Sequence, residues 1–130
     1  MLQTCALLAF SAAGLALQAQ DGPPEILSDL HRDIVKLDPQ HYKVDSENEY
    51  VRVVRVSLKA NETSPIHDDP PGIIVCQKEC HIRFTRPNGR VQDVHLADAQ
   101  TRLVYDESRS ETNLSTKPTE FLFIELKKSK

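Results

Sequence analysis

Short runs in which hydrophobic and polar residues alternate, separated by turn residues, occupy the chain from residue 41 onward. In residues 80–85, for example, apolar Cys, Ile and Phe side chains alternate with polar ones. A two-residue period predicts strands with one buried face, and many short strands between turns are typical of a β-sandwich or barrel. Pro87-Asn88-Gly89 predicts a tight hairpin after this run, because Asn and Gly tolerate positive φ. About eight strands are predicted.

Two hydrophobic runs depart from simple alternation. In residues 50–58, Val51 and Val53 have one parity, whereas Val56 and Leu58 have the other. We interpret this switch as a β-bulge at the Val53–Val54 doublet. Residues 72–76 are a continuous apolar run, which predicts a strand buried on both faces.

A different period precedes the strands. In the lead-in, residues 20–37, apolar residues recur at helical spacing after Pro23-Pro24, which predicts a short helix. The prediction is therefore an all-β, single-domain jelly-roll barrel over residues 38–127, with a short N-terminal helix. The chain has 130 residues, which is enough for one domain.

The first 19 residues are interpreted as a signal peptide. Residues 5–17 are uncharged and largely apolar, too short a run to span a bilayer comfortably, and small residues follow up to Ala19. An uncleaved anchor is the alternative. Cleavage would give an exported protein, periplasmic or secreted, with no remaining membrane attachment. Cys76 and Cys80 would be its only cysteines, and an oxidising compartment would favour a disulfide between them. Two unpaired cysteines beside a tight turn remain the alternative.

Charge and composition exclude some partners. The formal net charge is −3, Trp is absent, and aromatic residues make up 5% of the chain. An acidic chain without a basic run or a stacking platform gives no basis for nucleic-acid binding. Neither a nucleophile motif nor a phosphate-binding loop is present. A small molecule of unknown identity is the remaining kind of partner.

The order of several motifs resembles that of small single-domain cupins, from about residue 38 to 127. These motifs are Asp38-Pro39-Gln40-His41-Tyr42, Glu47-Asn48 with Val51-Arg52-Val53, Ser64-Pro65-Ile66-His67-Asp68-Asp69-Pro70, Arg83-Phe84-Thr85 with Pro87-Asn88-Gly89, and Asn113, Pro118 and Ile124-Glu125-Leu126-Lys127. The resemblance implies a double-stranded β-helix, a jelly-roll barrel. It also implies association into a homodimer through strand edges.

Cupins commonly hold a divalent metal through His-x-His on one strand and a further His on a late strand. Here His67 matches the first ligand, but Asp69 replaces the second, and Arg109 corresponds to the late His. A guanidinium is always charged and has no lone pair to donate. The resemblance therefore implies a degenerate metal site, with His67 and Asp69 as the two remaining metal ligands and no cofactor as the preferred reading.

Several roles for these residues stay open. We favour a buried ion pair between Arg109 and Asp69, which would neutralise both inside the barrel. A loop position for Arg109, with Asp69 capping a turn, is the alternative. His67, Asp69 and Arg109 could also line a ligand site in the barrel interior, with His67 and Arg109 as donors to a small anion. Additional metal ligands could come from a different register; the candidates are Glu62, Asp68 and Glu111.

The sequence thus predicts an exported cupin-like domain that is a non-catalytic ligand-binding or accessory protein. Whether it is an enzyme stays open, because one fold hosts many chemistries. The alternative is a metal-dependent cupin enzyme, of dioxygenase or isomerase type, that uses His67 and Asp69. A minor alternative is covalent haem at Cys76, Cys80 and His81, a lengthened form of the c-type attachment motif.

Overall fold

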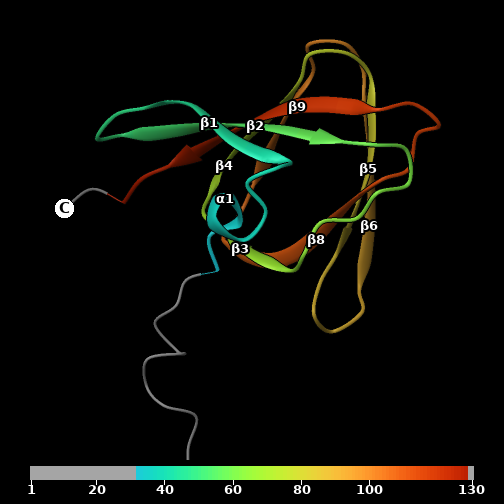
Figure 1. Ribbon diagram of the computed structural model, residues 1–130, viewed down its shortest axis with the longest axis horizontal. Helices are drawn as coiled ribbons and strands as arrows, with labels where there is room; N and C mark the ends of the chain where they lie inside the picture. The colour runs from blue at the N-terminus through green and yellow to red at the C-terminus, as the bar shows by residue number, and fades with distance from the viewer. Residues whose placement is uncertain (1–31, 129–130) are drawn as a thin grey trace, which may run out of the picture.

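The structure is a computed structural model that describes residues 32–128, and these form one short helix and nine strands in two antiparallel sheets (Figure 1). The elements are α1 (Ile34–Leu37), β1 (Tyr42–Glu47), β2 (Val51–Leu58), β3 (His67–Asp69), β4 (Gly72–Cys76), β5 (Cys80–Thr85), β6 (Val91–Leu96), β7 (Thr101–Val104), β8 (Glu107–Asn113) and β9 (Thr119–Leu126). One strand more than expected is therefore present in the described part.

The strands interleave between the two sheets. The five-stranded sheet has the order β1-β2-β9-β4-β7, and the four-stranded sheet has the order β3-β8-β5-β6. Strands far apart in the chain, such as β2 and β9 or β3 and β8, are therefore direct neighbours. This winding is that of a double-stranded β-helix, so the predicted all-β jelly-roll barrel with a short N-terminal helix is confirmed.

The core lies between the sheets. Along β5, Cys80, Ile82 and Phe84 are each at most 1% exposed, and the residues between them are only partly buried. The hairpin expected after β5 is present, with Gly89 at a φ of 84° and its backbone N–H donating to the Arg86 carbonyl. Alternation along the sequence thus indicates correctly which side chains of β5 point into the barrel.

The predicted bulge is on the wrong strand. β2 pairs with β9 in continuous register along its whole length. The irregularity lies in β1, where Asp45 is the extra residue between Val44 and Ser46. Val51 and Val53 lie on the outer face of β2, partly covered, while the even-numbered valines are buried. Apolar residues on both faces, rather than a change of register, explain the doublet.

β4 is less completely buried than expected. Gly72, Ile74 and Cys76 are buried, but Ile73 and Val75 are only partly covered. The glycine itself is required by close approach to β9, since a Cβ at this position would collide with the carbonyl oxygen of Ile124. One face of β4 therefore belongs to the core, and the other lies partly in solvent.

The helix is tied to the barrel by charge. Asp33 caps α1 by accepting a hydrogen bond from the Val35 backbone N–H at 3.1 Å. Arg52 on β2 donates both to Asp33, at 3.0 Å, and to Glu125 on β9, at 2.5 Å. The predicted signal peptide and most of the lead-in lie outside the described residues. Within residues 32–128, no helix is long and apolar enough to cross a membrane.

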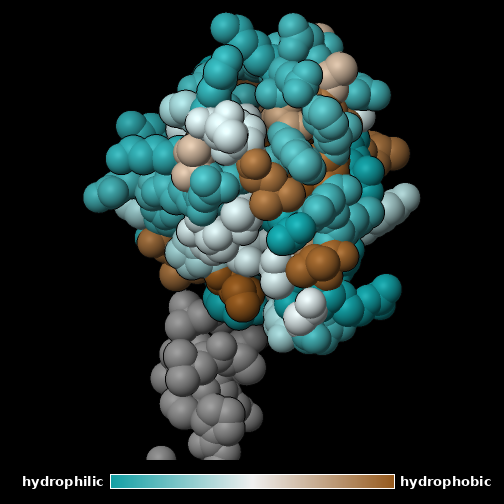
Figure 2. All heavy atoms as spheres, turned by 90° about the vertical axis from the view of Figure 1, so that its right-hand side faces the viewer, coloured by the Kyte–Doolittle hydropathy of each residue, from teal (hydrophilic) through white to brown (hydrophobic). Residues whose placement is uncertain are grey.

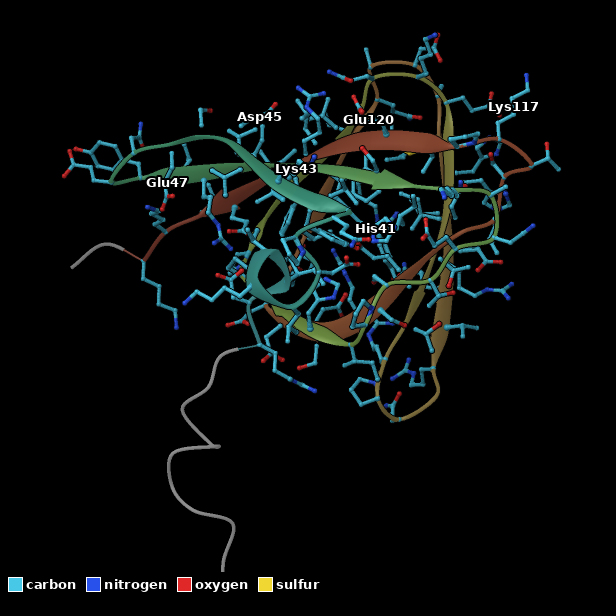
Figure 3. All side chains as sticks on the ribbon, in the orientation of Figure 1. His41, Lys43, Asp45, Glu47, Lys117 and Glu120 are labelled. Atoms are coloured by element: carbon cyan, nitrogen blue, oxygen red, sulfur yellow. A yellow bond between two sulfur atoms is a disulfide. The ribbon has the colours of Figure 1, made fainter. Side chains whose placement is uncertain are left out.

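The outer face of the five-stranded sheet is charged. Lys43, Asp45 and Glu47 lie along β1, and Glu120 lies on β9 (Figure 3). Arg55 on β2 pairs with both Asp45 and Glu120. On the side of the molecule that Figure 2 presents, hydrophobic residues are interspersed among hydrophilic ones. Ion pairs such as those of Arg55 are typical of a sheet face in contact with water.

Candidate functional site

Two adjacent strands of the four-stranded sheet carry a cluster of buried charged side chains. His67 and Asp69 lie on β3, and Arg109 and Glu111 lie on β8. Each pair is spaced by two residues, so both members point to the same face of the sheet. His67 is directly opposite Arg109 in the antiparallel register. All four are at most 2% exposed, which places them inside the barrel.

Arg109 is the centre of this cluster. Its Nε lies 2.8 Å from Oδ2 of Asp69, and its two terminal nitrogens lie 3.1 Å from Glu107 and 3.3 Å from Glu111. The guanidinium carbon lies 4.0 Å from the centre of the Phe84 ring, a cation–π distance. Burial alone would lower the pKa of Arg109, but the charges of Glu111 and Asp69 hold it above its ordinary value. The guanidinium is therefore charged and contacts three carboxylates.

His67 is oriented by a backbone carbonyl. Its Nδ1 lies 2.8 Å from the Pro65 oxygen, which can only accept, so Nδ1 carries a proton. Nε2 lies 3.3 Å from Oδ1 of Asp69. Neither this contact nor that between Arg109 Nε and Asp69 has the angles of a hydrogen bond, so charge attraction dominates both. Burial lowers the pKa of His67, but Asp69 and Glu111 outweigh it and raise the pKa to about 9.

Glu111 is held from the opposite sheet. Tyr42 on β1 donates its hydroxyl to Oε2 of Glu111 at 2.6 Å, and the Glu111 backbone N–H donates to Ser64. Burial, together with the adjacent Glu111 charge, raises the pKa of Tyr42 well above its usual value. The phenol therefore remains a hydrogen-bond donor. This contact joins the charge cluster to the other layer of the barrel.

The three candidate ligand residues of a metal centre come close together. His67, Asp69 and Glu111 each offer an atom, and these atoms lie within 4.8 Å of one another. Asp69, Glu107 and Glu111 carry three negative charges when ionised, and Arg109 together with Arg86, which pairs with Glu107, offsets two of them. One proton on His67 neutralises the third. A divalent ion in place of that proton would leave a net positive charge beside a buried guanidinium, which repels it. The residues therefore fit a proton better than a metal ion.

Other candidate residues lie outside the cluster. Asp68 points away from it, bonding Arg32 and Ser108, and Arg32 at 2.9 Å is the main reason that the pKa of Asp68 is lowered. Glu62 pairs with His41 at 2.7 Å. Neither residue is among the three candidate ligands that the structure brings together within residues 32–128.

The two cysteines are joined. Cys76, at the end of β4, and Cys80, at the start of β5, form a disulfide with a Cα–Cα distance of 6.1 Å. The neighbouring His81 stacks on His95, with ring centroids 5.2 Å apart. A disulfide uses both thiols that a covalent haem would need, so this arrangement gives the haem alternative no support.

Sequence reasoning brings together His67, Asp69 and Arg109, and the structure places these three in contact. It includes Glu111 only as a fallback metal ligand and misses Tyr42 and Glu107. The two-residue spacing of Glu107, Arg109 and Glu111 on one strand was the available signal for the two glutamates. No signal pointed to Tyr42, which lies 69 residues from Glu111 in the sequence.

A pocket of about 260 Å³ opens next to the cluster. Arg109 forms part of its wall, together with Phe84 from β5 and residues 102–105 from β7 and the turn after it. Through Arg109 this pocket reaches the charge cluster. Its size suits a small molecule.

Solved structures with a similar fold include cupins. A cupin domain from Bordetella pertussis Tohama I has a TM-score of 0.61 and 18% sequence identity, over 67% of this chain and 92% of that one. An RmlC-like cupin family protein with a double-stranded β-helix fold, from Methanocaldococcus jannaschii, has a TM-score of 0.53 and 14% identity, over 65% and 77% of the two chains.

A conserved protein with a double-stranded β-helix domain, from Klebsiella pneumoniae, has a TM-score of 0.52 and 15% identity, over 68% and 84%. No family model matches the sequence, and no curated protein matches it. At these identities the likeness concerns the fold, and the chemistry has to be argued from the residues.

Proposed function

The chain has the cupin fold, and from the charge balance inside its barrel we propose that it is a metal-independent, non-catalytic cupin that binds a small molecule. Fold alone does not choose among the chemistries that cupins host. The choice is made by side chains at the position where a metal would lie. Here that position is dominated by a permanently charged arginine.

The observation that carries this proposal is the contact of Arg109 with three carboxylates. Asp69 and Glu111 would be the anionic metal ligands, yet both already have a cation within 3.3 Å. The guanidinium is fully buried, so solvent does not weaken these contacts. With His67 protonated, the charges of His67, Asp69, Arg109 and Glu111 sum to zero, and Glu107 is balanced by Arg86.

Metal analysis of tag-free protein is expected to find well below one equivalent of Mn, Fe, Ni, Cu or Zn. Added metal should leave the melting temperature unchanged, because Arg109 repels a cation from the carboxylates. The double variant Asp69→His with Arg109→His restores the ligand pattern of metal-binding cupins and is the positive control. It is expected to retain about one equivalent. Stoichiometric metal in the natural protein, lost in His67→Ala, would contradict the proposal.

The second candidate function is a metal-dependent cupin enzyme of dioxygenase or isomerase type. The observation in its favour is that His67, Asp69 and Glu111 offer three atoms within 4.8 Å. It requires Arg109 to leave these carboxylates when the ion binds. The same metal analysis decides between the two functions.

We also propose that the protein is exported, after cleavage near residue 19, to the periplasm or the medium. The disulfide between Cys76 and Cys80 supports this location, because disulfides persist in oxidising compartments. N-terminal sequencing of protein from its native source is expected to begin at residue 20 or 21. Thiol labelling under denaturing conditions should find no free cysteine. A chain that begins at Met1 with two reactive thiols at 76 and 80 would contradict export.

We further propose that two copies associate through strand edges. β1 and β7 are the edges of one sheet, and β3 and β6 are the edges of the other. Exposed Tyr105 follows β7 directly, and exposed Leu103 lies on it. An unpaired edge with apolar side chains is a ready site for pairing. Light scattering on the purified protein distinguishes a dimer from a monomer.

A further inference from the structure

The pocket beside the charge cluster is rich in arginine. Arg86, Arg102 and Arg109 line it, and Glu107 is the one acidic residue among those lining it. The chain as a whole has a formal net charge of −3, so this concentration of positive charge is local. Such a concentration of positive charge attracts anions only where carboxylates of the protein do not already balance it.

Two of these arginines are already neutralised. Arg109 contacts Asp69, Glu107 and Glu111. Arg86 donates to Glu107 at 2.7 Å. Their positive charges are therefore balanced by carboxylates of the protein.

Arg102 is different. It lies on β7 two residues before Val104, which is 6% exposed, so both side chains point to the inner side of the sheet. Arg102 itself is partly buried. Among residues 32–128, no ion pair or side-chain hydrogen bond involves it. A partly buried guanidinium without a carboxylate is a ready partner for a bound anion, because it offers two parallel N–H donors.

The walls and the size of the pocket limit the ligand. Phe84 and Val104 are apolar but almost fully buried, and Gln92 adds a polar group. Leu103 and Tyr105 lie at the exposed rim. A volume of about 260 Å³ is small, below the roughly 300–1,000 Å³ of most ligand pockets. A single unpaired guanidinium is neutralised by one negative charge, which a carboxylate supplies and a phosphate dianion exceeds.

We propose that this pocket binds a small monocarboxylate, and that Arg102 pairs with the carboxylate. The proposal deepens the function proposed above and depends on it, since it assigns a ligand class to the same metal-independent barrel. The contact requires no redistribution of the buried charges around Arg109.

Benzoate and benzamide are suitable probes, because they have nearly the same shape and differ in charge. Titration calorimetry or NMR is expected to show millimolar or tighter binding of benzoate, and benzamide should bind at least tenfold more weakly. Arg102→Gln should weaken benzoate binding about tenfold and leave benzamide binding unchanged. Affinity for benzoate should also fall as salt is added. Inorganic phosphate should bind more weakly than benzoate.

Arg90→Gln is the matched control, because Arg90 is an exposed arginine that does not line the pocket. Equal affinity for benzoate and benzamide, no loss in Arg102→Gln, tighter binding of phosphate, or no binding of benzoate would each overturn the ligand class. If metal-free folded protein binds no benzoate, only this inference fails. If metal analysis finds a stoichiometric ion, the proposed function itself fails, whatever the anion titration shows.

Discussion

Replacing Arg109 with methionine is expected to lower the free energy of unfolding by about 3–5 kcal/mol, the usual cost of breaking a buried ion pair by removing one partner. Methionine fills a similar space beside Phe84 but leaves Asp69 and Glu111 buried without their cation. The carboxylates must then take up protons or draw in water. Urea denaturation followed by circular dichroism measures the loss.

Arg90→Met is the control for this prediction, since Arg90 is exposed and its removal should change stability by less than about 0.5 kcal/mol. Adding Asp69→Asn to Arg109→Met should restore part of the loss, because one of the two abandoned charges is then removed. Equal stability of Arg109→Met and the natural protein would show that the buried charge cluster does not form.

The pH dependence of stability should reveal the proton on His67. Its pKa is raised to about 9 in the folded protein, against about 6.5 for an ordinary histidine. Because the folded state binds this proton more tightly than the unfolded state, the proton stabilises the fold, fully so below pH 6.5. This stabilisation is lost as the pH rises through 9. The contribution amounts to about 3 kcal/mol. Urea unfolding between pH 6 and 9.5 measures it.

His67→Asn isolates the effect, because the asparagine amide nitrogen takes the place of Nδ1 and can still donate to the Pro65 carbonyl, but it takes up no proton. The variant should be less stable than the natural protein at pH 6, and the difference should shrink towards pH 9.5. Asp38 raises the pKa of His41 as well, but this contribution is present in both proteins and cancels in the difference. Parallel pH profiles for the two proteins would contradict a protonated His67.

The strands were readable from the sequence where one face is polar. β5 is the example, because its alternation is clean and its hairpin has the Asn-Gly signal. β2 has valines on both faces, so its pattern is ambiguous. The bulge opposite it belongs to β1, and only the pairing of the two strands reveals which one holds the extra residue.

The part of the site that depends on two-residue spacing along a strand is predictable from the sequence. The spacing of His67 and Asp69 puts both on one face of β3, and the motif order suggested Arg109 as their neighbour. Tyr42 was out of reach, because its contact with Glu111 arises only when the two sheets pack together. Arg102 was missed for the same kind of reason. Its lack of a partner is a property of the folded pocket rather than of its sequence neighbours.

Because β3 is short, the charge cluster also holds this strand in place. This strand has three residues and, within residues 32–128, pairs with a single strand, β8, so its backbone pairing is slight. Inside the barrel, Arg109 forms an ion pair with Asp69. On the outside, Asp68 forms an ion pair with Arg32 and accepts a hydrogen bond from Ser108. Separating β3 from β8 would therefore break ion pairs on both faces of β3 at once. We therefore expect β3 to unfold together with the whole barrel rather than to unfold locally.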